Sequence, residues 1–92
     1  MSGPVTFELP NNLTIATAES LHEQLEPLLT TGDDVVLNAA EVKRADTAGL
    51  QLLLAFQKAL ISRSVNMSWS APSQPLLEAA EQLGLKQMLA LE

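Results

Sequence analysis

Three stretches of the chain carry the apolar patterns of strands. Residues 5–9 and 65–69 alternate apolar and polar side chains, so each is expected to bury one face. Residues 34–38 form a short, β-branched apolar run, which is typical of a central strand buried on both faces. Residues 10–12 have turn chemistry and predict that residues 13–15 return as a second strand, in a hairpin with the first.

The first of three predicted helices follows Thr17, which we expect to be its N-cap. Pro27 lacks a backbone donor and should kink or loosen the last turn, which residues 30–33 then end. His22 lies among glutamates on the polar side of this helix and is interpreted as a solvated residue. The expected buried positions are Ala18, Leu21, Leu25, Leu28 and Leu29.

The second predicted helix, residues 47–62, is unusually apolar. Its buried stripe is expected to contain Leu50, Leu53, Leu54, Leu60 and Ile61. Leu52 and Phe56 widen the apolar arc beyond the roughly 100° that one covered face requires. This excess either binds a partner helix or is covered by the third helix or the C-terminal tail.

The third predicted helix is capped by Ser73, tolerates Pro75 in its first turn and ends at Gly84. Its expected buried stripe is Leu76, Leu77, Ala80 and Leu83, and residues 85–91 add a last apolar turn or tail. The element order is two strands, helix, strand, helix, strand, helix. This order predicts one α/β domain over residues 1–92, with residues 1–4 as a loose leader.

Composition excludes several functional classes. The chain has 11 acidic and 5 scattered basic residues, a net charge of -6, so a nucleic acid would be repelled. It has no cysteine and one histidine, which argues against a metal site and against nucleophilic catalysis. The four glycines are too dispersed for a phosphate-binding loop, so neither enzymatic activity nor a cofactor is expected.

The chain has no pattern that targets it to a membrane or for export. The longest apolar run, Leu52 to Phe56, is far shorter than the roughly 20 residues that span a bilayer. The N-terminus lacks a basic and then apolar signal pattern, so we expect a cytoplasmic protein.

One motif stands out, at the start of the most apolar helix. A loop leads to Asp46-Thr47-Ala48-Gly49-Leu50, and on these residues alone Asp46 or Thr47 is simply an N-cap. The motif resembles the signature of STAS domains, the anti-sigma-factor antagonist family, where Asp precedes Ser or Thr, a small residue, Gly and Leu. The element order agrees over residues 5–91. The resemblance implies a single mixed sheet of about four strands with three to four helices mainly on one face.

The resemblance also implies a function for this motif. In the family, a kinase partner phosphorylates the hydroxyl residue that aligns with Thr47, and free N–H groups at a helix start suit a phosphate. We expect Gly49 to let a partner's backbone approach, and Lys43 and Arg44 to contact a phosphate or nucleotide. The full partner-binding set is predicted to be Asp46, Thr47, Ala48, Gly49, Leu52 and Phe56.

The resemblance has one departure near this site and leaves several functions open. Thr14 stands where the family commonly has an acidic residue beside the phosphorylation site. The leading hypothesis is a bacterial signalling switch that docks on a kinase, an anti-sigma-type ATPase or a chemotaxis protein. The alternatives are a cytoplasmic regulatory subunit of a lipid-transport ABC system, and a domain that binds ATP or GTP.

Overall fold

The structure, a computed structural model, describes residues 3–91, so residues 1 and 2 of the predicted leader lie outside the described residues. Gly3 and Pro4 are exposed and precede the first strand. The elements, in chain order, are β1 (Val5–Glu8), β2 (Asn12–Leu13), α1 (Ile15–Leu25), the 3-10 helix η1 (Glu26–Thr30), β3 (Val35–Asn38), β4 (Arg44–Ala45), α2 (Thr47–Ser62), β5 (Met67–Ser70) and α3 (Gln74–Gln82).

The strands form two parallel ladders. β1, β3 and β5 make a three-stranded sheet with β3 in the centre, and β2 pairs with β4 alone. The α/β class is confirmed, but the single mixed sheet of about four strands becomes three parallel strands plus two. The predicted hairpin is wrong, because β2 pairs with β4, which lies about 30 residues further along the chain, and not with β1.

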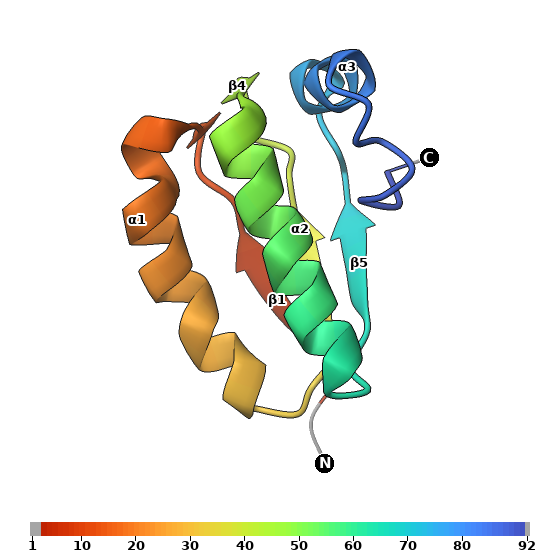
Figure 1. Cartoon of the computed structure of the whole chain (residues 1–92). Coiled ribbons are helices and arrows are strands. Elements are labelled where there is room, and N and C mark those ends of the chain that lie inside the picture. The colour runs from red at the N-terminus through yellow and green to blue at the C-terminus, as the bar shows by residue number, and fades with distance from the viewer. Residues whose placement is uncertain (1–2, 92) are drawn as a thin grey trace.

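The helices lie against one face of the three-stranded sheet. Figure 1 shows α1 and α2 side by side over β1 and β3, with α3 beyond the end of β5. Val35 and Leu37 of β3 point into this layer and are fully buried. Val36 and Asn38, on the other face, are only half-buried, so the prediction that this strand is buried on both faces is wrong.

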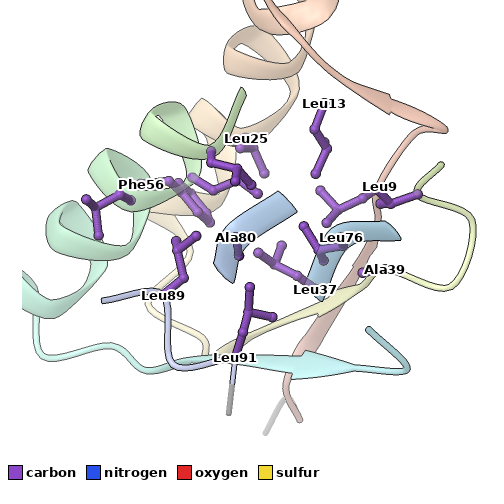
Figure 2. Close-up of a cluster of buried hydrophobic side chains, with 14 of the residues drawn as sticks. Leu9, Leu13, Leu25, Leu37, Ala39, Phe56, Leu76, Ala80, Leu89 and Leu91 are labelled. Carbon is purple, nitrogen blue, oxygen red and sulfur yellow. The ribbon is translucent and has the colours of Figure 1, made fainter. Parts of the chain in front are cut away.

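The core is built largely from leucine. Figure 2 shows side chains from the strands, the helices and the C-terminal segment meeting in one cluster. The C-terminal segment takes part through Leu85, Leu89 and Leu91, all buried. The Trp69 indole Nε1–H donates a hydrogen bond of 2.7 Å to the Leu89 carbonyl and attaches this segment to β5.

Most helix boundaries agree with the sequence patterns. α2 covers the predicted residues 47–62, the Ser73 hydroxyl caps α3, and α1 changes to η1 just before Pro27. Thr17 is not the N-cap of α1, which is Thr14. Thr17 is the third residue of the helix, and its Oγ1 accepts the Thr14 N–H at 3.1 Å.

Two residues expected in buried stripes are exposed. Ile61 is 59% exposed and Leu83 is 41% exposed. Ile61 lies in the last turn of α2, and Leu83 is the C-cap of α3. Both predictions are wrong, because helical spacing shows which residues share a face but not how far along the helix another element covers that face.

Candidate functional site

α1 and α2 begin in register with each other. In the β2–β4 ladder, Leu13 pairs with Ala45. The next residue on each strand, Thr14 or Asp46, is the N-cap of the following helix. Ile15 and Thr47 are therefore equivalent first residues of two adjacent helices, at the same end of the molecule (Figure 1). The prediction that the second strand runs to residue 15 is therefore wrong, because β2 ends at Leu13 and Ile15 starts α1.

Asp46 connects the two helix starts. Its Oδ1 accepts the Gly49 N–H of α2 at 2.9 Å, and its Oδ2 accepts the Ile15 N–H of α1 at 3.0 Å. Its own backbone N–H donates to the Leu13 carbonyl at 2.9 Å. One carboxylate thus satisfies free donors of both helices, where the positive ends of two helix dipoles meet.

The same contacts set the charge state of this carboxyl group. The Gly49 N–H contributes most to lowering the pKa of Asp46, and the Ile15 N–H contributes next. Partial desolvation opposes this shift, and the Ala48 N–H adds a smaller lowering effect. Asp46 is therefore a stable anion at neutral pH, directly before the candidate phosphorylation residue.

Thr47 is exposed at the first position of α2. Asp46 provides the N-cap, so the Thr47 hydroxyl is not needed for capping. Within residues 3–91, this hydroxyl has no hydrogen-bond partner. Ala48, the next residue, is half-buried.

Gly49 is buried, which corrects the expectation that it leaves room for a partner's backbone. A Cβ atom at this position would overlap the backbone carbonyl of Leu13 and lie 3.0 Å from the Leu13 Cα. Leu13 itself is fully buried. The glycine is required because β2 of the same chain lies against the first turn of α2.

Lys43 and Arg44 lie at the edge of an open hollow next to this site. Both side chains are exposed, while both backbone N–H groups donate to the Asn11 carbonyl, at 2.7 and 3.1 Å. Within residues 3–91, neither side chain has a hydrogen-bond or ion-pair partner. The hollow, of about 460 Å³, also contains Thr14, Asp46 and residues of α3. A phosphate or nucleotide held by these cations would bind here.

The extra apolar residues of α2 lie mainly against α1. Phe56 is only 5% exposed and Leu52 is half-buried. Both line a hollow of about 120 Å³ between the helices, together with Leu25 and Leu29. The prediction that Phe56 binds a partner is therefore corrected, since its side chain belongs to the core of this chain. His22 is exposed at the rim of the hollow.

The described part of the chain lacks two kinds of feature. Among residues 3–91, no group of histidine and acidic side chains is arranged to hold a metal ion. None of the helices in these residues is both long enough and apolar enough to cross a bilayer.

Comparisons with known proteins agree with this architecture. A similar solved structure is that of a sulfate transporter family protein from Wolinella succinogenes, with a TM-score of 0.75. The match covers 97% of this chain and 75% of that chain at 19% sequence identity, which shows a shared fold. No sequence among the curated proteins matches this chain. A family model described as "Mlab, STAS domain" matches residues 2–90, and the chain therefore belongs to the STAS domain family.

Proposed function

We propose that this STAS domain is a non-enzymatic protein-interaction switch in bacterial signalling, controlled by phosphorylation of Thr47. Its partner would be a kinase or an anti-sigma-type ATPase, which supplies the catalysis. The observation that carries this proposal is the exposed Thr47 hydroxyl, which has no internal partner because the adjacent Asp46 already caps the helix.

The geometry supports a switch based on charge. A phosphate on Thr47 would add a charge of roughly -1.5 to -2 at neutral pH. Asp46 already occupies the Gly49 and Ile15 N–H groups, so the phosphate would lie beside an anion that uses the nearest donors. The electrostatic potential of the exposed surface would then change sharply with little change in the core.

Thr14 fits the same proposal. It is the N-cap of α1 and lies in register beside Asp46, where the family commonly has an acidic residue. A carboxylate there would add a second negative charge beside Thr47. This chain therefore starts from a less negative site, and phosphorylation would produce a larger relative change in charge.

A pull-down tests the proposal directly. Tagged wild type, Thr47→Ala and Thr47→Glu are incubated with extract of the source cells, and retained proteins are quantified by mass spectrometry. We expect Thr47→Ala and Thr47→Glu to retain different amounts of one partner, because only the second mimics the added charge. Thr6→Ala and Thr6→Glu are the controls, since Thr6 is an exposed threonine on β1.

Two results would decide against the switch. One is equal retention of the same partner by the wild type and both Thr47 variants. The other is the absence of any phosphopeptide containing Thr47 when the protein is isolated from cells in which the partner kinase is active. The Thr6 pair shows whether an added negative charge elsewhere has the same effect.

The second candidate function is a regulatory subunit of a lipid-transport ABC system. Its support is the description of the similar structure as a sulfate transporter family protein, which associates this fold with transport. The same pull-down separates the two candidates through the identity of the retained protein. An ABC ATPase would favour transport regulation, and a kinase-type or anti-sigma-type ATPase would favour signalling.

A further inference from the structure

Ile15 is an apolar side chain in an exposed place. It is 73% exposed, more than the other exposed large hydrophobic residues of the described chain, Ile61, Leu83 and Met88. It is the first residue of α1, and its side chain is not part of the hydrophobic core or of the residues packed against that core. The fold therefore gives no reason for an isoleucine at this position.

The position of Ile15 relative to Thr47 is fixed in two ways. The β2–β4 register makes the two residues equivalent first positions of adjacent helices. The Asp46 Oδ2 accepts a hydrogen bond of 3.0 Å from the Ile15 N–H, while Oδ1 of the same carboxylate accepts one from the Gly49 N–H of α2. A protein that covers Thr47 would therefore also meet Ile15.

We infer that Ile15 is the apolar anchor of the docking surface at Thr47, and that this surface fits a protein partner with an apolar pocket bordered by carboxylates. The inference rests on the proposed function, because it names the chemistry of the partner at that same site. Anchors of this kind, apolar side chains buried in a pocket and surrounded by polar contacts, supply much of the energy of protein interfaces.

The acidic border of the partner follows from the charges around Ile15. Lys43 and Arg44 lie in one hollow with Thr14, the residue before Ile15, and their side chains have no partner within residues 3–91. The negative charge of Asp46 is directed at backbone N–H groups. Glu78 lines the α3 side of the same hollow and keeps its negative charge, while it accepts a hydrogen bond of 3.3 Å from Gln74.

Lys43 and Arg44 are the two adjacent basic residues of a chain of net charge -6, and both line the hollow at this end of the molecule. A partner with carboxylates beside its pocket would be attracted to this end of the molecule and repelled by most of the remaining surface. The same arrangement gives the switch a direction. A phosphate on Thr47 would offset the charge of Lys43 and Arg44, so phosphorylation should release the partner.

Photo-crosslinking in the source cells tests contact at Ile15 and captures the partner in the same step. The photoreactive amino acid benzoylphenylalanine is placed at position 15 and, as a control, at position 61. Ile61 is also highly exposed but lies in the last turn of α2, about 20 Å along the helix from Thr47. We expect a partner adduct from position 15 and little or none from position 61.

Affinity measurements with the crosslinked partner then test the chemistry. Ile15→Ala should weaken binding roughly 10- to 100-fold, the loss expected when a fully buried isoleucine contact is removed. The matched variant Ile61→Ala should bind like wild type. Lys43→Glu with Arg44→Glu should weaken binding by about 10-fold or more at low salt, and the effect should shrink as salt rises.

Charge reversal needs its own control. Lys58→Glu with Arg63→Glu makes the same change in net charge at exposed positions of α2 and at its C-cap. We expect this double variant to keep nearly the wild-type affinity. Melting temperatures of all variants establish that any loss of binding is not a loss of folding.

The results separate this inference from the proposed function. If the partner depends on Thr47 but Ile15→Ala binds as tightly as wild type, the anchor is refuted and the switch stands. If the Lys58 and Arg63 variant loses as much affinity as the Lys43 and Arg44 variant, or if Thr47→Glu binds more tightly than Thr47→Ala, the acidic partner is refuted. If wild type retains no partner at all, the proposed function itself fails.

Discussion

Replacing Gly49 with alanine would place a methyl group where the Leu13 carbonyl already lies. Alanine favours a helix over glycine by at most about 1 kcal/mol, so a Gly49 in open space would gain stability from this change. Here the obstacle is backbone, and the same carbonyl accepts the Asp46 N–H at 2.9 Å. Overpacking of a core costs about 1–3 kcal/mol, and loss of one hydrogen bond costs about 1 kcal/mol more.

Because the loss of the hydrogen bond and the gain in helix preference nearly cancel, the net cost of Gly49→Ala is close to the cost of overpacking. We expect a destabilisation of about 2–3 kcal/mol, in the upper part of the overpacking range, because backbone cannot move aside as a side chain can. For a domain of this size that corresponds to a fall in melting temperature of roughly 10–20 °C. Differential scanning calorimetry measures it. Ala55→Gly, at an exposed position inside the same helix, calibrates the helix preference and should cost about 1 kcal/mol.

A Gly49→Ala protein that melts at or above the wild-type temperature would refute the close packing of β2 on α2. Equal destabilisation by Ala55→Gly and Gly49→Ala would also count against this packing, because the effect would then reflect general sensitivity of α2. If a Gly49→Ala protein folds as stably as wild type but no longer binds the partner, Gly49 would instead be part of the docking surface.

Three further predictions concern single side chains. Asp46→Asn should destabilise the chain at pH 7, and the difference in unfolding free energy from wild type should shrink as the pH falls below about 3.8. The reason is that the hydrogen bonds that lower the pKa of Asp46 stabilise the fold only while its carboxyl group is ionised. Urea denaturation from pH 7 to pH 3 measures this difference. Ser73→Ala removes both the cap on the Leu76 N–H and the 2.6 Å hydrogen bond that the hydroxyl donates to the Val42 carbonyl, so it should cost about 2 kcal/mol by urea denaturation; an unchanged midpoint would mean that water replaces both contacts. Trp69→Phe removes the hydrogen bond to Leu89 and should cost about 1 kcal/mol, seen as faster amide exchange confined to residues 85–91; exchange that rises evenly along the chain would contradict a local attachment.

The sequence predicted best those features that depend on nearby residues. The bounds of α2 follow from a capping residue and 16 residues of helical spacing, and both signals lie within the segment itself. The cap at Ser73, the left-handed Gly84 that follows the C-cap Leu83, and the break before Pro27 are local in the same sense. The family motif added the STAS fold, which the family model confirms over residues 2–90.

The errors share a dependence on distant residues. Nothing in residues 10–15 indicates that β2 pairs with β4 and not with β1, and turn residues between two short strands predict a hairpin. The N-cap of α1 is Thr14 and not the predicted Thr17, because the helix starts directly after the ladder ends at Leu13. The apolar arc of α2 is as wide as its sequence indicates, but its width gives no information about which element covers Phe56.

The candidate site was predicted in part. The motif located Thr47 at a helix start, and the structure shows an exposed side chain there. The same motif suggested that Gly49 makes room for another protein, whereas it makes room for Leu13 of its own chain. A sequence pattern shows that a small residue is needed but not which backbone approaches it. Ile15 lies outside the motif, and only the structure shows its exposure and its contact with Asp46.

The short β2–β4 ladder determines where this chain can gain or lose residues. An insertion in the loop before Arg44 leaves the pairing of Leu13 with Ala45 intact, so the two helices still start together. One residue inserted between Ala45 and Asp46 would lengthen the extended segment before α2 by about 3.3 Å and move Asp46 out of register with Thr14. Natural variation in loop length should therefore accumulate upstream of the ladder, and libraries that graft new loops onto this scaffold should be built there.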